Sequence, residues 1–286
     1  MSTEQRVTAI LPAYRMGAFI GRALRSIACQ THADWEVVVV DDHGPEDGTT
    51  RIVQEFATAH PKNRVELIRH AHNQGVSAAR NSAMAAAKGR YLAFLDPDDI
   101  WAPWHLERTL KLIGDGSKAD VATGPVVRFQ DPPGRSFRTE LFLPDWKVDH
   151  FPFSLAIHNF IQPSATVLKR SVIEEVGGFT TDPHLQHIED YELWVRLVKA
   201  GKRFAFLRKP TSGYRKHPGA ASADMDRMSR LHERLHERHS GFFEAGTAQM
   251  LRVAFDRMEQ GVPGPWARFL KRVGSRWGAP RYPWLD

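Results

Sequence analysis

The run Trp35-Glu36-Val37-Val38-Val39-Val40-Asp41-Asp42 decides the fold class of this chain. A continuous β-branched run is expected for a parallel strand that is buried on both faces. This run ends on two acids, and open α/β sheets bind ligands beyond the carboxyl ends of their strands. The stretch therefore predicts an α/β protein with a ligand site that begins at its two aspartates.

Strands and helices alternate on both sides of this run. The flanking sequence predicts strands at Arg6–Leu11, Val65–Arg69 and Arg90–Leu95, and helices at Gly17–Gln30, Thr49–His60 and Val76–Lys88. Repeated strand–helix units with short connections imply a doubly wound sheet. The second half is more mixed, with expected strands at 119–129, 164–168 and 202–207, short helices at 171–176 and 191–199, a loop or hairpin at 130–149, and a charged helical segment after about residue 222.

The composition limits the class of protein and its partners. The 286 residues are 42% hydrophobic and 25% charged, and the single cysteine, Cys29, rules out an internal disulfide. A reducing compartment is therefore expected. No secretory signal follows Met1, and no apolar run approaches the ~18 residues that a transmembrane helix needs, so we expect a cytoplasmic protein. The net charge of +6 favours anionic partners: nucleotides, nucleic acid or an acidic membrane surface.

Three carboxylates follow the predicted strand that ends at Leu95, in the sequence Asp96-Pro97-Asp98-Asp99. Carboxylates this close repel one another unless a cation or hydrogen-bond donors compensate. Their hard oxygens suit Mg²⁺ or Mn²⁺, which would bridge a diphosphate and neutralise a leaving nucleotide. The alternative is an acidic loop that caps the next helix, with Asp99 as the N-cap.

Two further acidic pairs have simple alternatives. Asp41 and Asp42 can accept hydrogen bonds from ribose hydroxyls or a base N–H, but Asp and Gly also make ordinary turns. Glu189 and Asp190 open a predicted amphipathic helix, where the helix dipole stabilises acids. The functional interpretation of the second pair is a general base at the mouth of a pocket.

Taken together, the segments have the order and spacing of a known family. The chain resembles glycosyltransferase family 2 over about residues 5–220, through Val7–Tyr14, Ala28–Thr31, Trp35–Asp42, Asn73–Asn81, Leu95–Asp99, Gly177–Phe179, Glu189–Trp194 and Tyr214–Pro218. The resemblance implies an α/β GT-A fold: a Rossmann-like, nucleotide-binding domain at 1–221 with a mostly parallel central sheet flanked by helices. A C-terminal helical extension at 222–286 would follow it.

The resemblance also implies an activity. The chain would be an inverting, metal-dependent glycosyltransferase of the hexosyltransferase type. It would move a sugar from a nucleotide-diphosphate sugar, with a UDP-sugar favoured, to an acceptor hydroxyl on a glycan or a lipid-linked acceptor. Cell-surface polysaccharide or glycolipid assembly is the expected setting. The alternative is a catalytically silent sugar-nucleotide-binding protein of the same fold, and retention of Asp98 together with Asp190 argues against it.

Site residues follow from the resemblance by position. Asp190 would be the base that deprotonates the acceptor hydroxyl. Asp98 would bind Mn²⁺ or Mg²⁺ with the diphosphate, and His217 would be a second group in reach of the metal. Because a phosphate leaving group needs charge neutralisation more than a general acid, one base would be enough. The nucleotide sugar would be held by Pro12, Ala13, Tyr14, Asp42 and Arg80, with Asp96 on the ribose.

Two positions depart from the family pattern. His43-Gly44 stands where the family usually has Gly-Ser, and Arg15 stands where Asn is common. Both lie in the nucleotide half, so the base stays open between uridine, guanosine and thymidine. No G-x-G-x-x-G follows the first strand, which argues against a dinucleotide enzyme, and no RNA-binding motif accompanies the basic residues, so no nucleic-acid partner is expected.

Two C-terminal features need separate interpretations. His232-Glu233-Arg234-Leu235-His236 matches the zinc-protease pattern, but its charged surroundings favour a solvated helical face. Beyond Pro263-Gly264-Pro265, a predicted helix places Trp266, Phe269, Leu270, Val273 and Trp277 on one side and basic residues mostly elsewhere. That pattern is typical of an interfacial helix on a membrane surface. The alternative is packing on the protein itself or on a second subunit, as in a homodimer.

Overall fold

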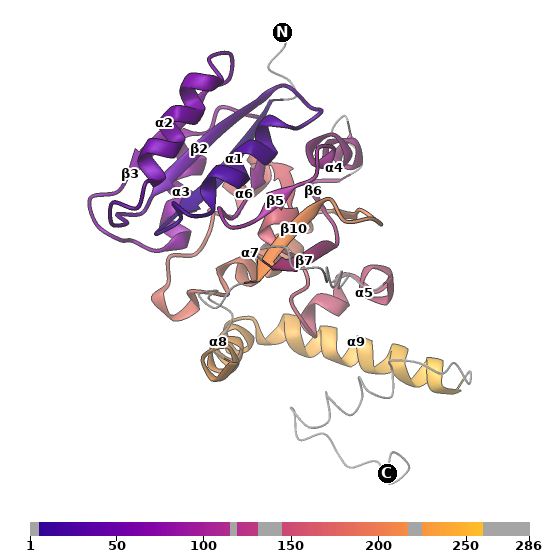
Figure 1. Ribbon diagram of the computed structural model, residues 1–286. Coiled ribbons are helices and arrows are strands. Elements are labelled where there is room, and N and C mark those ends of the chain that lie inside the picture. Colours follow the sequence, from indigo (N-terminus) through magenta and orange to yellow (C-terminus); the bar gives the residue numbers. More distant parts are fainter. Residues whose placement is uncertain (1–5, 115–118, 131–144, 217–224, 260–286) are drawn as a thin grey trace. The chain divides into compact units, whose positions relative to one another are not determined.

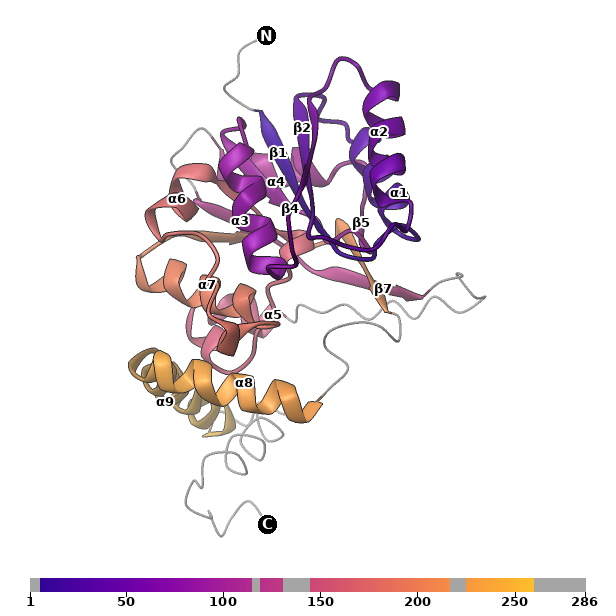
Figure 2. The ribbon, with the colours of Figure 1, turned by 90° about the vertical axis from the view of Figure 1, so that its left-hand side faces the viewer.

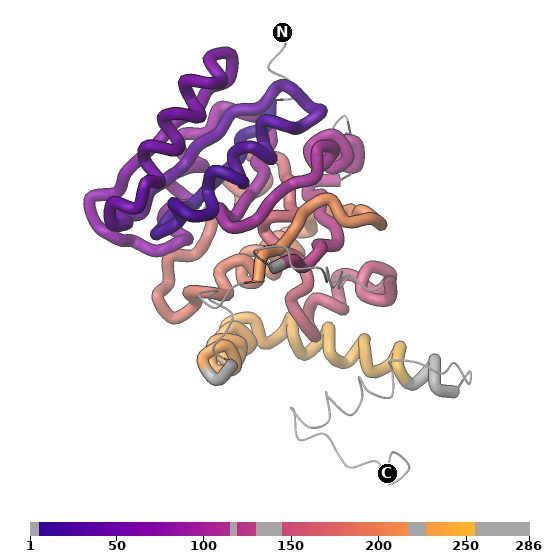
Figure 3. Tube along the Cα trace, viewed as in Figure 1, coloured from indigo at the N-terminus to yellow at the C-terminus, as the bar shows by residue number. Residues whose placement is uncertain are grey.

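The computed structural model describes residues 6–114, 119–130, 145–216 and 225–259 (Figure 1). Its first half alternates strands and helices as the sequence predicts. The elements are β1 (Val7–Ala13), α1 (Ile20–Ala28), β2 (Trp35–Asp41), α2 (Thr49–Ala59), β3 (Val65–Arg69), α3 (Val76–Ala86) and β4 (Tyr91–Phe94). Figure 3 follows the backbone through these units in indigo and purple.

The central sheet has seven strands in the order β3-β2-β1-β4-β8-β6-β9. β1 pairs in parallel with β2 and with β4, and β2 pairs in parallel with β3. All seven residues of β1 and of β2 are buried, because α1 and α2 cover one face of the sheet and α3 covers the other (Figure 2). This double cover explains the unbroken valine run in β2.

The second half completes both this sheet and a smaller one. Its elements in the larger compact unit are β5 (Ile100–Trp101), α4 (His105–Ile113), β6 (Val121–Thr123), β7 (Val126–Gln130), η3 (Pro163–Ala165), β8 (Val167–Lys169), α6 (Arg170–Glu175), η4 (Pro183–Leu185), α7 (Glu189–Lys199), β9 (Phe204–Phe206), β10 (Ser212–Lys216) and α8 (Met225–Arg238). β8 runs antiparallel to β4 and β6, so the sheet is mostly, not wholly, parallel. The α/β, mostly parallel fold predicted from the sequence is confirmed.

The single strand expected at 119–129 is wrong, because the structure divides it. β6 belongs to the seven-stranded sheet, while β7 joins a three-stranded sheet in the order β5-β10-β7. The break falls at Gly124-Pro125, where a Cβ on Gly124 would lie 2.8 Å from the Cβ of Leu207. Glycine allows this close approach and proline cannot donate to a ladder, so the chain leaves the first sheet there. The strand expected at 164–168 is likewise shortened to β8 after a 3-10 turn.

The chain divides into two compact units. The first holds residues 1–144 and 160–238, and the second holds 145–159 and 239–286. The second unit contains α5 (Asp145–Asp149), η2 (Phe153–Ala156) and α9 (Ser240–Glu259). α9 packs closely on η2, since a Cβ on Gly246 would lie 2.4 Å from the Cβ of Ala156. α5 occupies the last part of the expected loop or hairpin, and a domain boundary at 221/222 stays a prediction.

No helix among the described residues is long and apolar enough to cross a membrane. The C-terminal segment from 260 onward, with the expected interfacial helix, lies outside the described residues.

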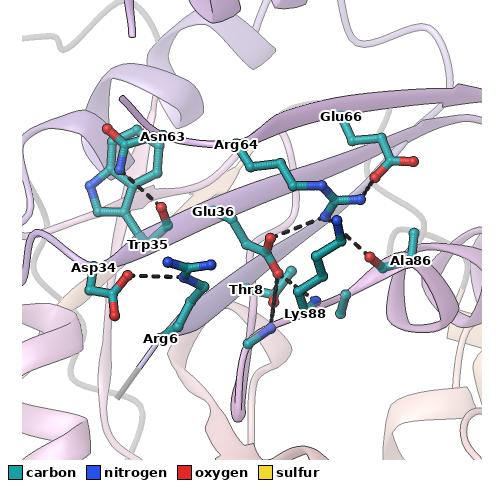
Figure 4. A network of polar contacts seen from close by, with 12 residues as sticks. Arg6, Thr8, Asp34, Trp35, Glu36, Asn63, Arg64, Glu66, Ala86 and Lys88 are labelled. Carbon is teal, nitrogen blue, oxygen red and sulfur yellow. Dashed lines mark hydrogen bonds and ion pairs between the residues drawn. The ribbon is translucent and has the colours of Figure 1, made fainter. Parts of the chain in front are cut away.

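A buried glutamate, Glu36, links β2 to β1 and to the turn before β4, at the amino ends of these strands. Glu36 is 1% exposed and accepts hydrogen bonds from the Thr8 hydroxyl at 2.5 Å and from the backbone N–H groups of Lys88 and Gly89 at 2.6 and 2.9 Å (Figure 4). Arg64 adds an ion pair at 3.1 Å. Burial raises the pKa of Glu36, but these donors outweigh it and the pKa lies below its usual value.

Glu36→Gln should lower the free energy of unfolding by about 2 kcal/mol, because it replaces a charged acceptor by an amide that faces four donors. Urea denaturation of both proteins measures the difference. Glu55→Gln is the matched control, since its ion pair with Arg51 is exposed and such changes stay within about 0.5 kcal/mol. Equal losses in the two variants would contradict a structural role for Glu36.

Candidate active site

The ends of three neighbouring strands bring the predicted ligand-binding segments together. Ala13 at the end of β1 is in register with Asp41 at the end of β2, and Ile10 of β1 is in register with Phe94 of β4. Tyr14, Asp42 and the acidic loop after β4 therefore leave the sheet at one edge. The sequence predicted this juxtaposition from parallel strand ends alone.

Asp42 holds the loop that leads into α3. One of its carboxylate oxygens accepts from the Gln74 N–H at 2.9 Å and lies 2.6 Å from His70 Nδ1, and the other accepts from the Gly75 N–H at 2.7 Å. Asp42 is 3% exposed. The structure thus shows Asp42 fixing loop 70–75. Its predicted contact with a nucleoside stays a prediction.

His70 is a residue of this edge that sequence reasoning missed. Its Nδ1 faces Asp42, and its Nε2 lies 2.9 Å from the Ser82 hydroxyl in the middle of α3. Because a carboxylate can only accept, Nδ1 carries a proton and donates it to Asp42, and Nε2 is hydrogen-bonded to the Ser82 hydroxyl. The three side chains have the order of a hydrolase triad, but Ser82 lies within a helix that packs on the sheet. The hydrogen bonds between Ser82 and His70 and between His70 and Asp42 therefore fix the orientation of the Asp42 side chain.

Two positions at this edge have left-handed backbone. Arg15 has φ 59° and His43 has φ 58°. Asn and Gly, the residues usual here in the resembled family, adopt this region more easily than Arg or His. Each departure therefore costs about 1 kcal/mol of backbone strain. His187, three residues before Asp190, has φ 77° and is the third non-glycine residue of this kind in the described chain.

The acidic loop after β4 is held from several sides. Asp99 is 2% exposed and its carboxylate accepts from the Arg215 N–H at 2.8 Å, while its own N–H donates to the Asp96 carbonyl. Burial, with Asp98 and Asp96 nearby, raises the pKa of Asp99. Asp96 and Asp98 are only partly buried. The loop thus presents these two carboxylates and turns the third inward.

Arg215 is a second residue that sequence reasoning missed. It lies on β10, is 1% exposed, and its Nε donates to the Asp98 carbonyl at 2.6 Å. Its guanidinium carbon lies over the rings of Phe129 and Phe19, at 4.5 and 5.3 Å from their centroids. The only sequence signal was its place beside His217 in the last family-like segment. Arg215 therefore sets the backbone of the acidic loop.

Arg80 joins the acidic loop to α7. It is 3% exposed, and its guanidinium donates to Asp96 at 2.7 Å and to Glu189 at 2.8 Å. Burial lowers the pKa of Arg80, but Asp96, Glu189 and Asp190 together raise it above its usual value. We expected Arg80 to contact the nucleotide sugar, and that contact stays a prediction. What the structure shows is a bridge between the end of β4 and the start of α7.

Asp190 lies in the first turn of α7, partly buried, and its Oδ1 accepts from the Tyr191 N–H at 2.7 Å. Its charge acts on the buried Arg80 guanidinium. The expected base and the acidic loop are thus linked through one cation. The structure therefore brings Asp190, Arg80 and Asp96 together, while the roles that the resemblance implies for them stay predictions.

The family model for glycosyl transferase family 2 matches residues 8–177, more than half of the chain. The chain belongs to glycosyl transferase family 2. Over 199 residues it is 32% identical to TuaG of Bacillus subtilis (strain 168), which is named as a teichuronic acid biosynthesis glycosyltransferase. The alignment covers 68% of this chain and 73% of TuaG. The family resemblance stated from the sequence is confirmed.

Solved structures agree with this glycosyltransferase in fold. S. aureus TarS 1–349 in complex with UDP-GlcNAc aligns with a TM-score of 0.64 and 20% identity, over 95% of this chain and 73% of that one. The mannosyltransferase PcManGT from Pyrobaculum calidifontis, in complex with GDP-Man and Mn²⁺, aligns with a TM-score of 0.59 and 20% identity, over 94% and 79%. At these identities the likeness shows the fold, and the predicted GT-A fold is confirmed.

The acidic loop of this glycosyltransferase fits a divalent cation. The described residues contain no cluster of three or more His, Cys, Asp or Glu side chains suited to a metal. Mg²⁺, however, is usually held by one or two carboxylates together with substrate phosphates. Asp98 and Asp96 are partly exposed hard-oxygen donors of that kind. His217, the other expected ligand, lies outside the described residues.

The charged helix α8 differs in part from its predicted solvated face. Leu231 and Leu235 are buried, and the His232 ring meets the Tyr191 ring edge-on at 5.9 Å. Glu233 and Arg234 are exposed, as expected. α8 is therefore amphipathic, and its histidine lies beside the residue that follows Asp190 in α7.

A buried histidine should make the folding stability of this glycosyltransferase depend on pH. His105 is 0% exposed, its Nδ1 lies 2.8 Å from the Thr211 hydroxyl, and its ring stacks on Trp101. The Trp101 indole in turn donates to the Ser164 carbonyl, and the Ser164 hydroxyl accepts from the Asp96 N–H. Burial lowers the pKa of His105 to about 3.

Stability should therefore fall as the pH drops from about 6.5 toward 3, because in that window the unfolded chain binds a proton that the folded chain does not. Between pH 7 and pH 5 the loss due to His105 is about 2 kcal/mol. Urea titrations at both pH values measure it. His105→Asn keeps a partner for Thr211 but cannot be protonated, so its loss over this range should be smaller by about that amount. The same pH dependence in both proteins would contradict the assignment.

Proposed function

We propose that this chain is an inverting, metal-dependent glycosyltransferase of the hexosyltransferase type. It takes a sugar from a nucleotide-diphosphate sugar, with a UDP-sugar as the favoured donor, to an acceptor hydroxyl. The observation that carries the proposal is the bridge from Asp96 through Arg80 to Glu189. That bridge holds donor-side and acceptor-side carboxylates at one edge of a GT-A sheet.

On the donor side, Pro12 and Ala13 end β1, Tyr14 follows them, and Asp42 fixes the neighbouring loop. Tyr14 is 39% exposed and offers its ring for stacking on a base. Asp96 would contact the ribose, and Asp98 would hold Mn²⁺ or Mg²⁺ with the diphosphate. The cation, when bound, supplies the charge neutralisation that a departing diphosphate needs.

On the acceptor side, Asp190 takes the proton of the acceptor hydroxyl. The acceptor oxygen forms its bond to the anomeric carbon as the bond from that carbon to the diphosphate oxygen breaks. A single displacement inverts the anomeric configuration. Arg80 compensates the charges of Glu189 and Asp96, and Asp190 is a partly exposed carboxylate at the start of α7.

The relatives support the class of donor and the setting. TarS and PcManGT are seen with UDP-GlcNAc and GDP-Man, both nucleotide-diphosphate sugars. TuaG is named for teichuronic acid biosynthesis, which favours assembly of a cell-surface polysaccharide or glycolipid.

A lipid-linked acceptor would suit a tail that docks on the inner face of a membrane. Liposome flotation of the full chain against a chain ending at Gly261 tests that docking, with packing on a second copy as the alternative.

A panel of nucleotide sugars with Mn²⁺, scored for slow hydrolysis and for binding by thermal shift, tests the activity. Hydrolysis of one donor, with stabilisation by its nucleoside diphosphate, is the expected result. Stabilisation without hydrolysis or transfer for any donor and acceptor would favour the catalytically silent alternative. No stabilisation by any nucleoside diphosphate would overturn both.

Chelation by EDTA should stop transfer, and Mn²⁺ or Mg²⁺ should restore it. Asp98→Ala should weaken nucleoside-diphosphate binding by about tenfold or more, since one charged contact is worth at least about 1.4 kcal/mol, while nucleoside binding changes less. Calorimetry with UDP and uridine measures both. Asp34→Ala, at the opposite edge of the sheet, is the control. Full activity in EDTA would make Asp98 a structural residue rather than a ligand.

A further inference from the structure

A cavity lies at the edge of the central sheet opposite the candidate active site. Its volume is about 440 Å³, within the range of small-molecule sites, and its lining includes Ser171, Glu174 and four basic residues, Lys88, Arg90, Lys169 and Arg170. Arg90 precedes β4 and Asp96 of the acidic loop follows it, about 20 Å away for an extended chain. The cavity is therefore separate from the proposed nucleotide-sugar site.

The pairing of β4 with β8 brings the four cations together. The two strands run antiparallel with Tyr91 in register with Lys169, and the Arg170 N–H donates to the Arg90 carbonyl at 2.9 Å. Lys88 lies in the connection from α3 to β4. Four positive charges thus meet where β4 begins and β8 ends.

Two of the cations are held in fixed positions in the cavity wall. The Lys169 side chain is 12% exposed, and its Nζ pairs with Asp120 at 2.9 Å. The Arg170 guanidinium donates to Glu174 at 2.8 Å and to the Ala87 carbonyl at 2.7 Å. Because these groups are ordered before any ligand arrives, binding does not have to order them.

The other two cations leave the cavity with an excess of positive charge. Lys88 and Arg90 are exposed, and within the part of the chain that the structure describes neither forms an ion pair with an acid. The acids at the cavity are Glu174 and the adjacent Asp120, and Asp120 also pairs with Arg203. An anion between Lys88 and Arg90 would offset the repulsion among the four cations.

The donor groups suit a phosphate. A guanidinium can donate two parallel hydrogen bonds to phosphate oxygens, an ammonium adds a compact charge, and the exposed Ser171 supplies a hydroxyl. A phosphate monoester carries about two negative charges at pH 7, which matches the two unpaired cations better than a single carboxylate does.

We propose that the cavity formed by Lys88, Arg90, Lys169, Arg170 and Ser171 binds the phosphate group of a second ligand, distinct from the sugar donor. The phosphate belongs either to a soluble phosphate ester or to the headgroup of an acidic lipid. The proposal does not depend on the transferase activity, because no residue of the cavity belongs to the proposed active site.

The test is a ³¹P NMR titration of inorganic phosphate with the full chain, at low ionic strength and in EDTA. Without a metal, the acidic loop of the proposed active site repels the probe. The double variant Lys88→Ala with Arg90→Ala should raise the dissociation constant at least about tenfold, since two charged contacts are lost. Added salt should weaken binding by the parent chain.

The double variant Lys62→Ala with Lys111→Ala is the matched control. It removes the same net charge at two exposed lysines that do not line the cavity. Its dissociation constant should stay within about twofold of the parent value, and melting temperatures check that all three proteins are folded. Equal weakening in the two double variants would show an adventitious ion only, attracted by net charge, and would overturn the proposal.

Flotation with vesicles of phosphatidylglycerol, compared with phosphatidylcholine, separates the two sources of phosphate. Reduced flotation of the Lys88→Ala, Arg90→Ala variant on phosphatidylglycerol assigns the cavity to a lipid headgroup. Flotation that these substitutions do not change, with phosphate binding lost, assigns it to a soluble ester. No binding of phosphate by the parent chain, or equal binding by the parent and the cavity variant, would overturn the proposal and leave the proposed function standing.

Discussion

Asp190→Asn is expected to reduce transfer by about 10²–10⁴-fold, the usual cost of losing a general base. The amide keeps the shape of the side chain and can still accept from the Tyr191 N–H. It cannot take the proton of the acceptor hydroxyl. Binding of the donor nucleotide should change little, because the base acts on the acceptor. Initial rates with a donor identified by the panel, together with calorimetric binding of its nucleoside diphosphate, measure the two effects separately.

Asp34→Asn is the control for this prediction. It makes the same chemical change at the opposite edge of the sheet, where Asp34 pairs with Arg6. Its rate should stay within about twofold of the parent chain, as for a surface substitution away from the site. Unchanged turnover in Asp190→Asn would remove Asp190 from the mechanism. A parallel loss of nucleotide binding would show that the residue holds the donor instead.

Arg80→Met is expected to lower the free energy of unfolding by about 3–5 kcal/mol. Methionine fills much of the same volume, but it leaves Glu189, which is 6% exposed, without its cation. Asp96 loses its partner as well. Urea denaturation measures the loss. Arg51→Met is the matched control, because its pair with Glu55 is exposed and should contribute less than about 0.5 kcal/mol.

The double variant Arg80→Met with Glu189→Gln shows where the cost arises. If an uncompensated buried charge is the cause, neutralising Glu189 should recover a large part of the loss, and the two changes will not add. A loss in Arg80→Met below about 1 kcal/mol, or strict additivity in the double variant, would contradict the role of Arg80 as a buried bridge.

The sequence predicted the strand ends well because one pattern determines them. Valine runs such as Val37–Val40 need burial on both faces, and parallel strands put their carboxyl ends at one edge. The positions of Tyr14, Asp42 and Asp96 follow from that rule alone. The predicted helix at Gly17–Gln30 was longer than α1 at both ends, since the hydrophobic spacing does not mark where hydrogen bonding begins.

The contacts within the site were not predictable in the same way. Arg80 was expected to face the ligand. The sequence around Arg80 does not indicate that it pairs with Asp96 and Glu189, which lie 16 and 109 residues further along the chain. Arg215 reaches the acidic loop because β10 pairs with β5 in a second sheet that no periodicity announced. The strained backbone at His43 depends on a turn, and the sequence showed only that the residue was unusual there.

The division of the second unit between two distant segments has a consequence for synthesis of the chain. Trp146 and Ile157 pack against a small core formed by Met250 and Ala254. Synthesis of α9, which supplies that core, ends about 100 residues after synthesis of the earlier segment. At about 5–20 residues per second, the earlier segment is therefore made about 5 to 20 s before the helix on which it packs. During that interval its apolar side chains lack the core that later shelters them. A premature stop before Ser240 would leave them exposed permanently, as a target for chaperones and proteases in the middle of an otherwise finished chain.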